Sequence, residues 1–105
     1  MKNLAKGISR VLARLFPTRT SFEDGSYIEW FNREAILYVE PNGWKMELPW
    51  MFRSGHAKGR VLQASDIDRW DVPHEKDPVS PDKKTEIRAK VVEYCRKRNI
   101  PLEIT

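Results

Sequence analysis

Hydrophobic residues follow three successive spacings along this chain. In residues 3–15 (NLAKGISRVLARL) apolar side chains recur every three or four positions, which predicts an amphipathic helix. Further along, apolar and polar residues tend to alternate, as they do in strands. Residues 81–98 return to helical spacing. The pattern therefore predicts an N-terminal helix within residues 1–19 and a single α+β domain over residues 20–105.

The predicted N-terminal helix is strongly basic. It contains no acidic residue, and its basic residues are Lys2, Lys6, Arg10, Arg14 and Arg19. One interpretation is a helix docked on the domain, with its Lys and Arg stems along apolar surface. A second is a helix that binds an anionic membrane surface or another anionic partner, and a third is an Arg-rich organelle leader. The arginines that interrupt its apolar region argue against a secretory signal.

Three short segments rich in β-branched, aromatic or alternating residues follow: SYIEWFN, EAILYVE and WKMELPW. Turn-forming residues precede the first segment at positions 24–25 and mark the links between the three at positions 32–34 and 41–43. Because links this short join antiparallel neighbours, we expect a β-meander. The strand-like segments RVLQA and PLEIT extend the predicted antiparallel sheet to about five or six strands.

The longest helical pattern covers residues 81–98. Ser80 is a good N-cap, Pro81 suits the first helical position, and Asn99 can adopt the left-handed conformation after the last turn. The expected apolar stripe consists of Ile87, Val91, Tyr94 and Cys95. We therefore expect one long C-terminal helix packed on the sheet.

Composition limits the protein to one domain with little core to spare, since it has 105 residues of which 40% are hydrophobic. Its net charge of +4 comes from the basic N-terminal segment, and the remainder is nearly neutral. A single cysteine excludes an internal disulfide and a Cys-rich zinc site, and it suits a reducing cytoplasm. No apolar run has the roughly 18 residues of a membrane-spanning helix. We expect a cytoplasmic protein.

The residue types that carry catalysis form no recognisable set. His56 and His74 have no second ligand at metal-binding spacing. Cys95 falls on the apolar stripe of the C-terminal helix, where a buried structural thiol is expected. The loop of residues 53–60 (RSGHAKGR) lacks the order of a phosphate-binding P-loop, and a solvated hairpin loop is the better interpretation. We therefore predict a protein that is not an enzyme and holds no metal or cofactor.

Residues 66–81 (DIDRWDVPHEKDPVSP) combine acids, prolines and one tryptophan ahead of the C-terminal helix. As a connector, the segment would begin with a helical turn over residues 66–70, place Trp70 in the core and be stiffened by its prolines. As a partner surface, its excess of acids beside an aromatic anchor would capture a basic protein. Both interpretations stay open. The residues predicted to bind a partner are Asp66, Asp68, Trp70, Asp71, His74 and Glu75.

Three segments in the order ILYVE, IDRWDVP and KKTEIRAKVVEYCRKRNIPLEI resemble a family of small predicted immunity proteins from bacterial polymorphic-toxin loci. The resemblance covers about residues 25–104, and its fixed points are Ile67, Trp70 and Pro73. It implies a β-meander, an I-x-x-W-x-x-P segment, and a helix closed by a short strand. It also implies a protein that binds a cognate toxin domain and blocks its active site or substrate entry without turnover.

The function expected from this resemblance is a non-catalytic immunity protein whose partner is a toxin domain and which has no small-molecule substrate. The alternative is a small adaptor that binds an anionic membrane surface or nucleic acid through the helix of residues 1–19. Phosphate contacts would make that second interaction weaken steeply with salt.

Overall fold

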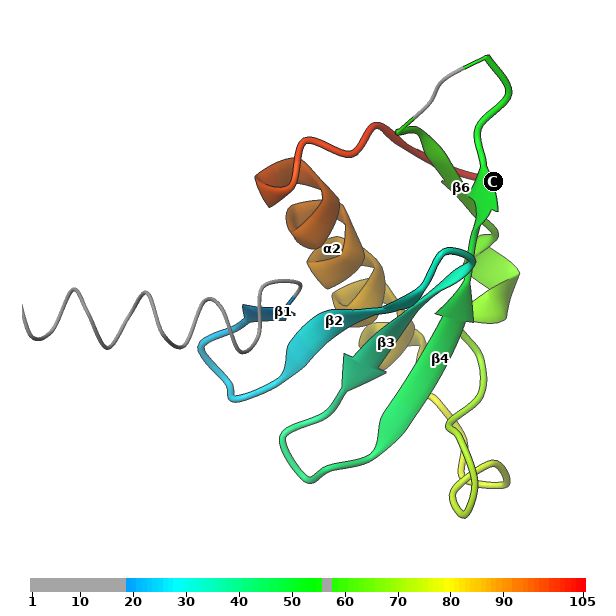
Figure 1. Cartoon of the computed structure of the whole chain (residues 1–105). Coiled ribbons are helices and arrows are strands. Elements are labelled where there is room, and N and C mark those ends of the chain that lie inside the picture. The colour runs from blue at the N-terminus through cyan, green and yellow to red at the C-terminus, as the bar shows by residue number, and fades with distance from the viewer. Residues whose placement is uncertain (1–18, 56–57) are drawn as a thin grey trace, which may run out of the picture.

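The computed structural model describes residues 19–55 and 58–105. These residues form two β-sheets and one long helix, α2 (Pro81–Lys97), so the predicted α+β class is confirmed (Figure 1). The helix predicted within residues 1–19 lies outside the described part of the chain, except that Arg19 already belongs to the first strand. His56 also lies outside the described residues.

The larger sheet is the antiparallel meander that the turn signals predicted. Its strands lie side by side in chain order: β1 (Arg19–Ser21), β2 (Tyr27–Asn32), β3 (Ala35–Val39) and β4 (Lys45–Pro49). In the β3–β4 turn the Gly43 N–H donates to the Glu40 carbonyl at 2.9 Å, and Gly43 has a φ of 94°, which residues with a side chain rarely adopt. The register places Ile36 opposite Leu48, and both side chains are fully buried.

The predicted single antiparallel sheet is wrong, because the described residues form seven strands in two sheets. The smaller sheet contains β5 (Met51–Phe52), β6 (Arg60–Leu62) and β7 (Leu102–Ile104), in that order. β7 runs parallel to β6. Two parallel neighbours need a long crossover between them, and here α2 provides it.

The two sheets separate at Trp50, between β4 and β5. The Trp50 N–H donates to the Glu34 carbonyl at 2.8 Å, on the β3 side, whereas the Arg53 N–H donates to the Gly59 carbonyl at 2.9 Å, on the β6 side. Backbone groups of successive strand residues point to opposite sides. The chain over residues 45–52 therefore exchanges one neighbouring strand for another and links the two sheets.

Helix α2 confirms the predicted C-terminal helix. The Ser80 hydroxyl oxygen accepts from the Lys83 N–H at 3.1 Å, and Asn99 has the expected left-handed φ of 56°. The predicted apolar stripe is buried, at Ile87, Val91, Tyr94 and Cys95. In Figure 1 the helix crosses one face of the β1–β4 sheet, and the hydrophobic core lies between them.

Polar contacts also fix α2 to the loops of the meander. The Lys90 ammonium lies 2.6 Å from Asp24 Oδ2 and 2.8 Å from Ser26 Oγ, both in the β1–β2 turn. The Lys83 ammonium lies 2.9 Å from a carboxylate oxygen of Glu40, which follows β3. Two positions of the helix are thus tied to two separate loops of the sheet.

Candidate partner-binding surface

Aromatic rings hold the acidic segment of residues 66–75 against the core. Trp70 is 4% exposed, and its ring centroid lies 5.8 Å from that of Trp44 and 6.3 Å from that of Tyr38. The predicted burial of Trp70 is therefore confirmed. His74 is half-buried and stacks on Trp44, with 3.8 Å between ring centroids. The segment is therefore fixed at two points, through the contacts of Trp70 and His74 with Trp44.

The path of this segment differs from the predicted helical turn over residues 66–70. A 3₁₀ turn, η1 (Ala64–Asp66), comes earlier, and Gln63 at its N-cap makes no side-chain cap hydrogen bond. After η1 the described chain forms no further helical turn before it reaches the edge of β4 at Asp71. The Val72–Pro73 peptide bond is cis.

Asp71 covers part of the outer edge of β4. Its N–H donates to the Lys45 carbonyl at 2.8 Å, and its Oδ1 accepts from the Glu47 N–H at 3.1 Å. Open sheet edges invite pairing with other chains, and proteins commonly cover them. One of the acids predicted to bind a partner thus has a structural role within the fold.

The remaining acids of the segment lie closer to solvent. Asp68 and Glu75 are exposed and Asp66 is half-buried, and within the described residues none of them takes part in an ion pair. A shallow hollow of about 480 Å³ lies beside Glu75 and is lined also by Arg69, Trp70, Asp71 and Val72. Val72 is 80% exposed and adds an apolar side chain. We refer to Asp66, Asp68, Val72 and Glu75 as the acidic surface.

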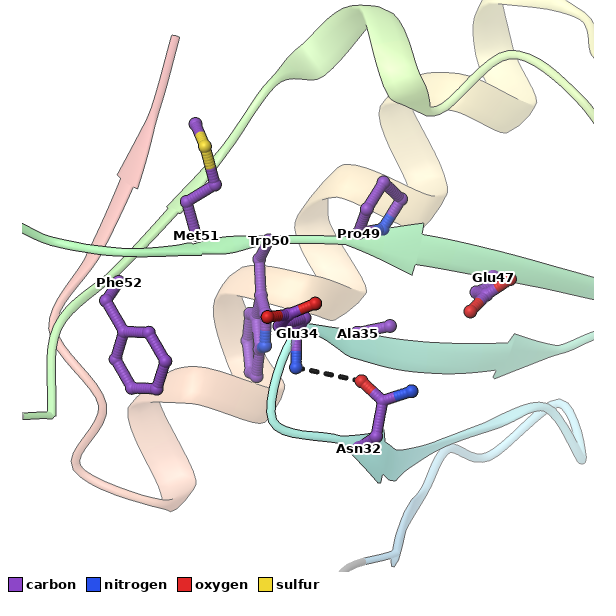
Figure 2. Close-up of a pocket in the computed structure, with 8 residues that line it drawn as sticks. All are labelled: Asn32, Glu34, Ala35, Glu47, Pro49, Trp50, Met51 and Phe52. Atoms are coloured by element: carbon purple, nitrogen blue, oxygen red, sulfur yellow. Dashed lines mark hydrogen bonds between the residues drawn. The ribbon is translucent and has the colours of Figure 1, made fainter.

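A second hollow, of about 520 Å³, lies where the two sheets meet (Figure 2). The β2–β3 turn, the ends of β3 and β4, and β5 contribute its lining: Asn32, Glu34, Ala35, Glu47, Pro49, Trp50, Met51 and Phe52. Met51 and Phe52 are 57% and 53% exposed, although both side chains are large and apolar. We call this site the junction hollow. Alternation along the sequence does not reveal it, since its residues come from elements that meet only in the folded chain.

A buried arginine lies next to the junction hollow. Arg60 is 6% exposed, and its guanidinium carbon lies 4.1 Å from the Phe52 ring centroid and 5.5 Å from those of Trp30 and Trp50. Its Nη1 donates to two main-chain carbonyls of the preceding residues, at 3.0 and 3.1 Å. Among the described residues it forms no ion pair, so aromatic faces provide most of its other contacts. The predicted solvated loop of residues 53–60 therefore ends in a buried residue.

Three further properties of the described residues concern metal ligands, the single thiol and membrane-spanning helices. They contain no group of three His, Cys, Asp or Glu side chains arranged to hold a metal ion. Cys95 is buried, and this burial raises the pKa of its thiol to about 11, so the thiol is protonated and weakly nucleophilic at neutral pH. A search of the same residues for a helix long and apolar enough to cross a membrane finds none.

Comparison with known proteins identifies one family. The family model described as Immunity protein 74 matches residues 51–105. No curated protein and no solved structure matches the chain. The matched residues include the acidic surface, α2, and the two exposed apolar residues of the junction hollow, Met51 and Phe52.

Proposed function

Because the chain belongs to the Immunity protein 74 family, we propose that it binds a cognate bacterial toxin domain and neutralises it in a stoichiometric complex, without turnover. The family match over residues 51–105 is the observation that carries this proposal. Neutralisation by binding requires the partner to occlude the toxin's active site or the path of its substrate. We place this interaction in the cytoplasm of the cell that makes the toxin.

The acidic surface is the proposed contact for a basic face of the toxin. Asp68 and Glu75 are exposed there, and Trp70 and His74 support the segment through their rings. Opposite charges across an interface accelerate encounter and disfavour wrong partners. Because the segment is ordered before binding, little conformational entropy is lost in the complex. In this proposal the acids contact the toxin, and Trp70, Asp71 and His74 position them.

Genome context identifies a candidate toxin as a toxin domain encoded next to this gene, and co-expression with that domain tests the proposed function. We expect the chain to restore bacterial growth and to co-purify with the toxin in a fixed ratio. Co-expression with an unrelated toxin is the control and should give no rescue. Equal killing by the cognate toxin with and without this chain would refute the proposal.

The contribution of the acidic surface is tested by a double charge reversal, Asp68→Lys with Glu75→Lys. We expect toxin association to become slower, because charges at an interface rim act mainly on the association rate. The melting temperature should change by a few degrees at most, since exposed substitutions alter stability by about 0.5 kcal/mol or less each. Glu23→Lys, exposed in the β1–β2 turn, is the matched control. An unchanged association rate would make the segment a connector alone.

The basic segment of residues 1–19 lies outside the family match. Its binding to an anionic surface stays a prediction from the sequence. The test compares how anionic vesicles bind the full chain and a chain lacking residues 1–18. Equally weak binding of both would contradict that prediction.

A further inference from the structure

We infer that the junction hollow is a second part of the toxin-binding surface, and that it receives a lysine or arginine side chain flanked by apolar residues of the toxin. The inference rests on the proposed function, since it names where the toxin binds and by what chemistry. Three features of the hollow carry it: an exposed apolar rim, walls that are fixed in advance, and carboxylates that form no ion pair with the described residues.

The apolar rim consists of Met51 and Phe52, which are neighbours in β5. They are 57% and 53% exposed, so roughly half of each large side chain lies in water. In Figure 2 the two side chains point to opposite sides of the strand, so each presents its apolar surface on a different side of β5. Large exposed apolar side chains beside a hollow commonly mark protein contact sites. Methionine and aromatic residues are also enriched at such interfaces relative to the rest of a protein surface.

The Phe52 ring is held in place from within the protein. The guanidinium carbon of Arg60 lies 4.1 Å from the centroid of this ring, and Arg60 as a residue is 6% exposed. A guanidinium plane stacks well on an aromatic face, so this contact restricts the ring. An anchor that is fixed before binding loses little rotamer freedom in the complex.

The opposite walls of the hollow are fixed as well. The Trp50 indole N–H donates to the Arg33 carbonyl at 3.3 Å, and the Trp50 ring meets Trp30 edge to face at 5.4 Å between centroids. Asn32 Oδ1 accepts from the Glu34 N–H at 2.8 Å, as Figure 2 shows. The β2–β3 turn that carries Glu34 is therefore held in a defined shape.

Glu34 and Glu47 are the charged residues that line the hollow. Both are exposed, and within the described part of the chain neither carboxylate takes part in an ion pair. Two such carboxylates attract a cation. A lysine or arginine satisfies them with its charged end and covers apolar surface with its stem, whereas a bare metal ion would leave Met51 and Phe52 in water.

The junction hollow adjoins the acidic segment of residues 66–75 along β4. Glu47 lines the hollow, and its N–H donates to Asp71 Oδ1 at 3.1 Å. A smaller hollow on Pro49, Trp50 and Met51 also includes Asp66 of the acidic surface. A single toxin face can therefore contact both sites at once.

The inference is tested by measuring the Kd of the full chain for the toxin domain against which it protects cells. Met51→Ala and Phe52→Ala should each raise the Kd by roughly tenfold or more, as truncated interface anchors do. The double variant Glu34→Gln with Glu47→Gln keeps the shape of the hollow and removes its charge, so the Kd should rise about threefold to tenfold and depend less on salt. If Phe52→Ala does not fold because Arg60 loses its contact with the ring, Met51→Ala still tests the inference.

Matched controls are Val92→Ala, at an apolar residue 47% exposed on α2, and Glu23→Gln in the β1–β2 turn. Both should leave the Kd within about twofold, as most residues outside the anchors do. Full affinity in the Met51, Phe52 and Glu34/Glu47 variants would overturn the inference and leave the proposed function intact. A toxin that is neither bound nor neutralised would overturn both.

Two other occupants of the hollow give separate results, and either one would overturn the inference. If a second copy covers it, the unbound chain is a dimer in light scattering and Phe52→Ala makes it a monomer. If the chain's own basic segment covers it, deletion of residues 1–18 lowers the melting temperature of the parent but not that of the Glu34→Gln, Glu47→Gln variant.

Discussion

Trp70 joins the acidic surface to the core, because its ring packs between two buried or half-buried aromatic residues while Asp68 and Arg69 beside it are exposed. With 4% of its surface exposed, Trp70 offers a partner almost no contact of its own. Its contribution to binding is to hold the neighbouring acids in place, and its contribution to stability is its packing.

Trp70→Ala should lower the free energy of unfolding by about 3–5 kcal/mol, because it removes a buried ring and leaves a cavity between Trp44 and Tyr38. Urea denaturation gives this value directly. Val72→Ala, two residues away and 80% exposed, is the control and should change it by about 0.5 kcal/mol or less. A loss below about 1 kcal/mol for Trp70→Ala would mean that the ring does not pack as described.

Asp24 gives the stability of the protein a predictable dependence on acid. Hydrogen bonds from the Lys90 ammonium and the Ser26 hydroxyl hold the pKa of its carboxyl well below the usual range. The folded state therefore favours the deprotonated form, and this contribution to stability is complete above the unfolded pKa of roughly 3.9. It is lost as the pH falls below that value toward the lower folded pKa.

Lowering the pH from neutral to about 3 should therefore reduce the free energy of unfolding less in Asp24→Asn than in the parent. Urea denaturation at a series of pH values measures the slope. Glu23→Gln, the adjacent exposed acid, is the control and should keep the slope of the parent. Identical slopes in parent and Asp24→Asn would contradict the role assigned to the Lys90 contact.

At the scale of elements, α2 depends on a cap at the point where the acidic segment ends. The Ser80 hydroxyl accepts from the Lys83 N–H, and Pro81 follows at the first helical position. The same cap places Lys83 near Glu40, so the start of the helix is fixed both locally and against the sheet.

Ser80→Ala should reduce the free energy of unfolding by about 1 kcal/mol, since the Lys83 N–H loses its acceptor. Ser80→Asp retains an acceptor at the same position and should stay close to the parent. Thermal or urea unfolding followed by far-UV circular dichroism compares the two. Equal losses in both variants would show that the cap hydrogen bond is not the cause.

At the scale of the whole molecule, one core joins both sheets and α2. The buried cluster includes Met46 from β4, Leu62 from β6, Trp70 from the acidic segment and Val91 from α2. No part of the described chain therefore has a separate hydrophobic core that would let it unfold independently of the rest.

We expect the protein to unfold in a single transition. Tryptophan fluorescence reports on the ring contacts of Trp44 and Trp70, and far-UV circular dichroism reports mainly on α2, so the two urea curves should share one midpoint. Separate midpoints would indicate that the smaller sheet or the acidic segment opens independently, against the single domain expected over residues 20–105.

The sequence by itself determined α2, the meander and the membership of an immunity-protein family. The helix carries its own signals within a few turns: the Ser80 cap, the buried stripe and the left-handed Asn99. Turn residues at short intervals left antiparallel neighbours as the possible arrangement of β2–β4, whereas β1 was not among the predicted strands. The resemblance in the segments around Trp70 and α2 is confirmed by the family match over residues 51–105.

Only the tertiary structure decided the second sheet, the junction hollow and the surroundings of Arg60. β5 has two residues, too few for alternation to register. β6 and β7 fall within the predicted strand-like segments RVLQA and PLEIT, but their parallel pairing depends on where α2 returns the chain. The sequence identified Asp71 as one of the acids that could bind a partner. It could not show that its carboxylate accepts from the Glu47 N–H, because the two residues are 24 positions apart. Spacing along a sequence reports on neighbours within a helix or strand, whereas these features arise from contacts between distant segments that only packing brings together.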